Sequence, residues 1–250
     1  MDDPIRAART LVGEMFPDAL AAILGGSTAH GKGTPTSDLD IVVVLDGPAE
    51  VRAESLVWRS WPVEVFVQTY ESALAFMRWD RERGTATLAF MCGQGVILLD
   101  RDGSAARLRS TAERIIGDGR PATSGADLDR LRYTVTDLRD DLTGVPDGEE
   151  TADELLAIAA ALLNDTAALL FAALPHWGGG GKWLPRRLRE AAPELAEPLL
   201  AGYRTLVRGG PREPFAQAVG AVLDHCGGPL WAGFTRTPDA RMRAELGLPD

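Results

Sequence analysis

The segment Gly25–Val44, GGSTAHGKGTPTSDLDIVVV, places a glycine-rich turn and two carboxylates directly ahead of a continuous apolar run. The apolar residues Ala19–Leu24 stop at this turn, which predicts a buried strand, and Asp38–Leu45 predicts a second one. Asp38 and Asp40 are two positions apart on that strand, so their side chains project from the same face. Acidic groups at the mouth of a buried strand are costly unless an opposite charge offsets theirs. The segment therefore predicts a bound cation.

A third acidic residue, Glu64, interrupts the apolar segment Trp61–Gln68. We expect this segment to form a hairpin with Glu54–Trp58, in which Glu64 and its flanking valines occupy opposite faces of the strand. A carboxylate in such surroundings should be paired, protonated or bound to a metal. An ion pair with Arg59 is the structural explanation, and a metal site is the functional one.

The three acids suit Mg²⁺, which prefers oxygen ligands and is held by one or two carboxylates together with substrate phosphates. If the strands that carry them are neighbours, Asp38, Asp40 and Glu64 converge and can hold two Mg²⁺ ions. One ion would activate an attacking oxygen, and the other would stabilise a pyrophosphate leaving group. The alternative is that Asp38 is an ordinary turn or capping residue.

The turn ahead of the acids, Gly25-Gly26-Ser27, fits a phosphate-binding role. Glycines let the backbone approach a ligand closely, and a turn that opens a helix presents free N–H groups to phosphate oxygens. We expect a short helix at Thr28–Lys32, and Ser27 adds a hydroxyl donor. The turn is therefore the candidate site for the β- and γ-phosphates of ATP or another nucleoside triphosphate.

A P-loop is the first alternative for this stretch, because Gly26–Lys32 matches the first seven positions of that motif. The next position must be Ser or Thr to hold magnesium, and here it is Gly33. A long helix must also follow, but Thr34-Pro35 comes instead. The P-loop interpretation is therefore disfavoured.

The N-terminal part of the chain mixes strand and helix patterns, whereas the C-terminal part shows helical patterns only. In the first part we also expect helices at Pro4–Phe16, Glu71–Arg83 and Thr85–Cys92, and a strand at Val96–Leu99. Further helices are expected at Ser104–Ile116, Ala126–Leu142, Thr151–Leu174, Leu184–Ala191, Glu194–Val207 and Pro214–His225. The sequence thus predicts an α/β (α+β) domain with a mixed sheet over residues 1–118 and an all-helical domain over residues 125–250.

Composition narrows the class of partner. The 250 residues carry a formal net charge of −10, the opposite of what a long nucleic acid requires, and this charge suits a cationic small molecule. We expect no signal peptide, and no apolar stretch approaching the roughly 20 residues of a membrane helix. Cys92 and Cys226 form no metal-like or disulfide-like pattern, and each is interpreted as a small buried apolar residue. A cytoplasmic protein is expected, and the sequence does not indicate an oligomeric state.

Lysine is rare in this chain. Of the 26 basic residues only Lys32 and Lys182 are lysines, and both lie among glycines. Lys182 leaves the glycine run Gly178–Gly181 and could reach a triphosphate held by the first domain. The alternative is a helix stop followed by a new helix, with Lys182 in solvent.

Several acids of the helical half could line a pocket for a cationic acceptor. Asp137 and Asp141 share a helix face by their spacing, and Asp165 lies in an apolar helix. The alternative for the first two is a solvated face or ion pairs with Arg130 and Arg132.

These motifs together resemble the nucleotidyltransferase superfamily of DNA polymerase β. Its signature is a hydrophobic residue and a Gly-Gly or Gly-Ser pair, a spacer, an acid–hydrophobic–acid triplet, and a third acid on a later strand. The matching residues are Leu24-Gly25-Gly26-Ser27, Asp38-Leu39-Asp40-Ile41 and Val63-Glu64-Val65. The resemblance implies that Asp38, Asp40 and Glu64 bind metal, and that Gly26 and Ser27 bind the triphosphate.

The chain length and the helical second half are similar to small bacterial antibiotic nucleotidyltransferases, which act on aminoglycosides or lincosamides. This resemblance implies transfer of AMP from ATP to a hydroxyl of a small acceptor, release of pyrophosphate, and a role in antibiotic resistance. In such enzymes the third acid, or an acid of the helical domain, acts as the base.

Two other functions stay open at this point. The acceptor could be a protein side chain, as in antitoxin-like minimal nucleotidyltransferases. The domain could also be a nucleotide-binding module that has lost catalysis, although the intact set of three acids argues against that.

Overall fold

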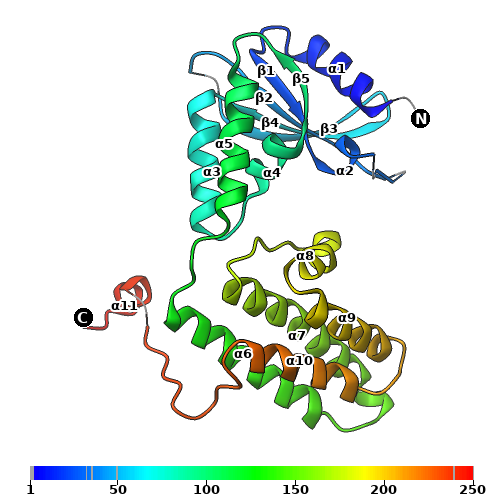
Figure 1. Ribbon diagram of the computed structural model, residues 1–250, viewed down its shortest axis with the longest axis vertical. Coiled ribbons are helices and arrows are strands. Elements are labelled where there is room, and N and C mark those ends of the chain that lie inside the picture. The colour runs from blue at the N-terminus through cyan, green and yellow to red at the C-terminus, as the bar shows by residue number, and fades with distance from the viewer. Residues whose placement is uncertain (1–2, 32, 35, 49, 239, 250) are drawn as a thin grey trace. The chain divides into compact units, whose positions relative to one another are not determined.

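The computed structural model describes residues 3–31, 33–34, 36–48, 50–238 and 240–249. The chain divides into two compact units, Met1–Pro121 and Ala122–Asp250 (Figure 1).

The first unit is built on a five-stranded mixed sheet with the strand order β3-β4-β2-β1-β5. Strands β2 and β4 run parallel, whereas the other neighbouring pairs are antiparallel. The strands are β1 (Ala21–Leu24), β2 (Leu39–Val44), β3 (Arg52–Trp58), β4 (Trp61–Gln68) and β5 (Val96–Asp100). The predicted α/β class with a mixed sheet is confirmed, and so is the hairpin of β3 and β4.

Helices cover both faces of this sheet (Figure 1). Helix α1 (Pro4–Met15) begins after Asp3, whose side chain accepts a hydrogen bond from the backbone N–H of Ile5. Helix α1 packs on one face, and helices α3 (Tyr70–Glu82), α4 (Thr87–Gln94) and α5 (Ser104–Asp118) lie on the other. The core cluster that includes α1 contains these alternate residues of β2 and β4: Leu39, Ile41, Val43, Val63, Val65 and Val67.

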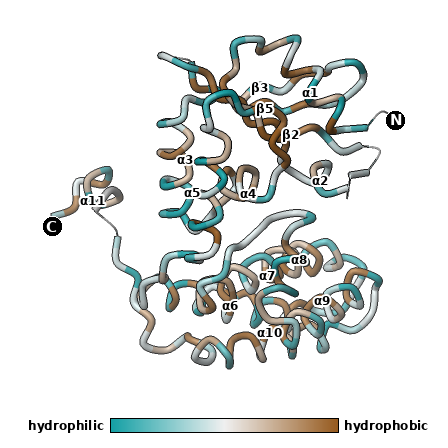
Figure 2. The backbone as a smooth tube through the Cα atoms, turned by 45° about the horizontal axis from the view of Figure 1, so that its top comes forward, coloured by the Kyte–Doolittle hydropathy of each residue, from teal (hydrophilic) through white to brown (hydrophobic). Residues whose placement is uncertain are grey.

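Strand β2 is the hydrophobic centre of the unit. Every residue from Ile41 to Val44 is fully buried, and Figure 2 shows this strand as strongly hydrophobic. A central strand buried on both faces reads as a continuous apolar run, which explains why its pattern does not alternate. Asp40 is the partly buried position of this strand, between the fully buried Leu39 and Ile41.

The short helix of the glycine turn differs from its prediction. Helix α2 spans Gly26–Ala29, whereas the sequence predicted Thr28–Lys32. Gly25 is extended and caps the helix, and Gly31, with a φ of +65°, follows its end. Lys32 lies outside the described residues.

The turn between β3 and β4 holds two non-glycine residues in the left-handed region, Arg59 at φ +46° and Ser60 at φ +69°. Two-residue hairpin loops favour this conformation, but they normally use Asn-Gly. Two contacts hold the Arg59 side chain in place. Its guanidinium lies 4.5 Å from the ring centre of Trp58 and 2.5 Å from the carboxylate of Glu14. Ser60 has the larger positive φ of the two residues.

Replacing Ser60 with glycine is expected to raise the free energy of unfolding by about 0.5 kcal/mol. Relief of left-handed strain, roughly 1–2 kcal/mol, outweighs the extra chain entropy of glycine, roughly 0.4–1 kcal/mol. Urea unfolding followed by circular dichroism measures the change. Ser55→Gly, on the exposed side of extended β3, is the matched control and should lower stability instead. Equal changes in both variants would contradict the strain argument.

The second unit is mostly helical among its described residues, as predicted. Its helices are α6 (Gly125–Gly144), α7 (Ala152–Ala173), α8 (Leu184–Ala191), α9 (Pro193–Val207), α10 (Glu213–His225) and α11 (Ala240–Leu246), with 3₁₀ turns η1 (Glu149–Thr151) and η2 (Gly181–Trp183). Leu162, Leu169 and Leu170 of α7 and Phe215 of α10 are fully buried in one core cluster. Helix α11 and both 3₁₀ turns were not predicted.

One segment, Glu149–Ala173, is long and apolar enough by length and composition to cross a membrane. It has 25 residues, and an 18-residue stretch within it has a mean hydropathy of 1.9. The expectation that no apolar stretch approaches that length is therefore wrong. Helix α7 supplies Leu162, Leu163, Leu169 and Leu170 to the core of the second unit. A helix packed on several sides is hydrophobic on several sides, which gives this composition its physical reason.

The two cysteines behave as weakly acidic thiols. Cys92 is fully buried, and burial raises its pKa to about 12. Cys226 is half-buried, and burial raises its pKa to about 11. Both thiols are therefore protonated at neutral pH. Cys92 is buried as expected, whereas Cys226 is only partly buried.

Candidate active site

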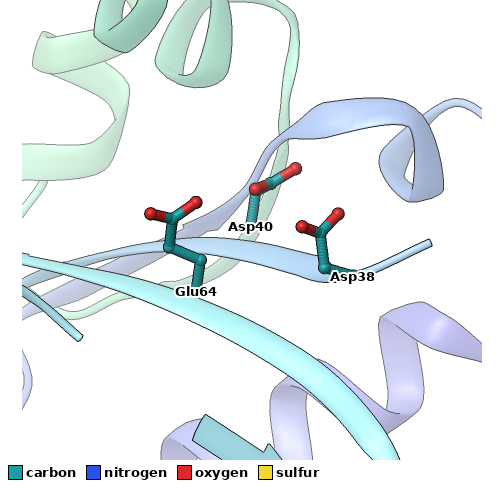
Figure 3. Close-up of side chains that lie close together, drawn as sticks. All are labelled: Asp38, Asp40 and Glu64. Atoms are coloured by element: carbon teal, nitrogen blue, oxygen red, sulfur yellow. The ribbon is translucent and has the colours of Figure 1, made fainter. Parts of the chain in front are cut away.

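Three carboxylates meet where β2 and β4 lie side by side. The parallel register pairs Asp40 with Glu64, and Asp38 directly precedes β2. All three side chains lie on the same side of the two strands (Figure 3). One oxygen atom of each lies within 4.8 Å of the corresponding atoms of the other two. Asp38, Asp40 and Glu64 therefore converge, as expected if the strands that carry them are neighbours.

The surroundings of these carboxylates favour a cation. Each side chain is only partly buried, so the cluster can be reached from solvent. Arg59, the alternative partner of Glu64, forms its ion pair with Glu14 instead. Three carboxylates at this spacing repel one another, and a divalent cation with oxygen ligands would offset that repulsion. The donor set therefore fits Mg²⁺.

The glycine turn packs directly against the second carboxylate. The N–H of Gly25 donates to the carbonyl of Asp40 at 2.7 Å, which continues the pairing of β1 with β2. Gly26 has a φ of +68°, and a Cβ at this position would lie 1.9 Å from Oδ2 of Asp40. A Cβ on Gly25 would lie 2.9 Å from the side chain of Met91. Both positions therefore require glycine, and the turn lies beside the acids.

The glycine turn and the three carboxylates all lie within a sequence match to one protein family. Residues 5–86 match the family described as nucleotidyltransferase domain. This part of the chain is therefore similar to nucleotidyltransferase domains. The matched range includes the glycine turn and all three carboxylates, so the predicted enzyme class, nucleotidyltransferase, is confirmed.

Other comparisons are more distant. A nucleotidyltransferase-like protein from Exiguobacterium sibiricum is similar in structure, with 14% sequence identity and a TM-score of 0.42. The match covers 88% of this chain and 74% of that chain. No curated protein matches the sequence.

Two hydroxyl groups that the sequence analysis did not single out, those of Ser37 and Thr28, connect the glycine turn to the start of β2. Ser27, in the glycine turn, is buried, and its Oγ lies 3.4 Å from Oγ of Ser37. The hydroxyl of Thr28 donates to the carbonyl of Asp38 at 3.2 Å. The available signal was the run of Ser and Thr around the turn and before Asp38, residue types that favour local side-chain to backbone bonds.

Lys182 belongs to the second unit, where it lies on η2 and is exposed. Gly181, before it, has a φ of +51°, so the glycine run does end in a turn that glycine favours. Contact between Lys182 and a triphosphate held by the nucleotidyltransferase domain stays a prediction.

The acids of the second unit are partly accounted for. Arg130 and Arg132 pair with Asp127 and Asp129, at 2.9 and 2.8 Å, rather than with Asp137 or Asp141 further along α6. Asp165 is half-buried on α7, and burial raises its pKa. An acceptor-binding role for Asp137, Asp141 or Asp165 stays a prediction.

Proposed function

We propose that the protein transfers a nucleoside monophosphate from a nucleoside triphosphate, with ATP as the first candidate, to a hydroxyl group of a small molecule. The observation that carries this proposal is the meeting of three carboxylates beside a glycine turn inside a nucleotidyltransferase domain. Paired acids alone would fit many metal sites. Acids that can hold a metal ion, next to a turn whose backbone can approach phosphates, fit a binding site for a triphosphate with its metal ion.

In this proposal Asp38, Asp40 and Glu64 hold Mg²⁺, and two ions fit the number of acids. Bound Mg²⁺ supplies charge stabilisation to the attacking and leaving oxygens. The acceptor oxygen forms a bond to the α-phosphorus while the bond from that phosphorus to its bridging oxygen breaks. Pyrophosphate leaves, and the hydroxyl proton passes to a base, for which Glu64 is our candidate.

The glycine turn and the second unit have separate tasks in this proposal. Gly25, Gly26 and Ser27 would bind the triphosphate through backbone N–H groups and one hydroxyl. Lys182 would add a positive charge to the same phosphates. Residues 1–118 would then carry nucleotidyl transfer, and the helical residues 125–250 would carry acceptor contacts.

The acceptor class follows from charge. The formal net charge of −10 favours a cationic small molecule such as an aminoglycoside-like compound, and it disfavours a long nucleic acid. We also propose that the protein acts in the cytoplasm, without a membrane partner, and that it contributes to antibiotic resistance.

Pyrophosphate release tests the proposal directly. The purified protein receives each of the four nucleoside triphosphates with Mg²⁺, with and without a panel of aminoglycosides and lincosamides. We expect release that depends on the acceptor and disappears in the double variant Asp38→Asn/Asp40→Asn. No release from any mixture would contradict the small-molecule acceptor. Release that persists in the double variant would contradict the metal site.

A further inference from the structure

The segment before the first carboxylate is organised around one hydroxyl group. Ser37 is buried, and its Oγ accepts a hydrogen bond from the backbone N–H of Thr34 at 2.8 Å. The same oxygen lies 3.1 Å from Oγ1 of Thr34 and 3.4 Å from Oγ of Ser27. The N–H of Ser37 also donates to the carbonyl of Thr34 at 3.0 Å. Ser37 thus closes a turn and touches the glycine loop at once.

A second bond runs parallel to this contact. The hydroxyl of Thr28 donates to the carbonyl of Asp38, the residue that follows Ser37. Two neighbouring residues of α2 therefore contact two neighbouring residues at the entry of β2. Networks of this kind fix the relative position of the groups they join, because buried hydroxyls are costly to leave without partners.

The two structures joined here have different tasks in the proposed function. Ser27 belongs to the turn proposed to bind the triphosphate, and Asp38 is proposed as a metal ligand. Neither Ser37 nor Thr28 belongs to the three-carboxylate cluster. Ser37 contacts Ser27 of the glycine turn, and Thr28 bonds the backbone carbonyl of Asp38, so both act on the backbone that carries the proposed ligands, as outer partners of metal ligands do.

We infer that Ser37 is a positioning residue that holds the phosphate loop and Asp38 in a fixed relation, with Thr28 as its second link. Metal binding at the carboxylates and nucleotide binding at the turn then favour each other through this link as well as through direct contact. The inference rests on the proposed function, since it assigns the two ligands to these two places. Coupling of this kind is reciprocal between the two ligands.

The test compares Mn²⁺ binding, used as a probe for Mg²⁺, with and without a non-hydrolysable ATP analogue. The measured quantity is the enhancement, meaning the ratio of the two Mn²⁺ affinities from calorimetric titration. In Ser37→Ala we expect the enhancement to fall by about tenfold, the lower end for partners of metal ligands. Thr28→Val, which keeps the side-chain shape, should change it in the same direction.

Thr36→Ala is the matched control, since it removes an exposed hydroxyl next to Ser37 whose partner is Thr34. It should leave the enhancement unchanged, and circular dichroism checks that each variant folds. General loosening of the site would lower both Mn²⁺ affinities equally and leave their ratio intact. An unchanged ratio in Ser37→Ala and Thr28→Val would overturn the inference while the proposed function stands. If Asp40→Asn bound Mn²⁺ as tightly as the unchanged protein, both the inference and the proposed function would be overturned.

Discussion

Asp40→Asn is expected to lower the rate of pyrophosphate release by at least about 1000-fold while the protein keeps its fold. Asp40 lies opposite Glu64 in the parallel register and shares the cluster with Asp38. An amide has nearly the same shape as the carboxylate but carries no charge. The lost charge weakens the site for a divalent ion, and about 4 kcal/mol of transition-state stabilisation corresponds to a factor of 1000.

The fold should survive this change, because Asp40 is only partly buried and its backbone carbonyl keeps the bond from Gly25. Circular dichroism and the unfolding midpoint check this point. Glu54→Gln on β3 is the matched control, since it neutralises a carboxylate of the same sheet that takes no part in the cluster. It should retain full activity. Normal turnover in a folded Asp40→Asn protein would contradict the metal site.

Much of this site could be predicted from the sequence, because strand alternation is a strong local rule. Residues two apart on a strand share a face, so Asp38 and Asp40 had to point the same way. Glu64 between valines stood out as an acid in an apolar strand. Local patterns do not reveal which strand lies next to β2. Its parallel neighbour is β4, although β3 comes between them in the sequence. The resemblance to a known superfamily supplied the expected convergence, and the strand order shows its geometry.

The contacts that support the carboxylates could not be predicted in the same way. The sequence indicates that Gly26 is in a turn, but it does not indicate that the turn packs on Asp40. Ser37 reads as a loop residue, and its partners depend on how the chain folds back on α2. Such contacts join residues across a loop, and their distances follow from tertiary packing rather than from spacing.

In the helical unit, too, local periodicity could be predicted from the sequence, whereas tertiary contacts could not. Long amphipathic patterns predicted most helices within a few residues, because their period is fixed by the 3.6-residue turn. Apolar composition was less informative, since α7 satisfies the length of a membrane span and also forms the core of its unit. Ion pairs were the hardest to predict: Arg130 and Arg132 pair with acids three residues earlier on α6 and not with Asp137 or Asp141 further along it.

Gly26→Ala is expected to lower pyrophosphate release by at least about 100-fold. A methyl group on this residue would lie 1.9 Å from Oδ2 and 3.0 Å from Cγ of Asp40. Contacts that short cannot persist, so either the carboxylate or the turn must move. Displacement by about 1 Å in a catalytic constellation can cost about 100-fold in rate. Left-handed backbone strain adds roughly 1–2 kcal/mol to the cost.

Gly31→Ala separates the collision from the strain. Gly31 lies in the same loop with nearly the same φ, +65°, but a Cβ there would meet no atom within 4 Å. This control carries the strain without the collision, so it should lose stability and keep most of its activity. Kinetic measurement of kcat and KM for the triphosphate, with unfolding midpoints for both variants, completes the comparison. If the two variants lost activity equally, strain in the loop would explain the loss. If Gly26→Ala kept normal activity, the close packing of the turn on Asp40 would have no part in catalysis, and the phosphate loop would have to lie elsewhere.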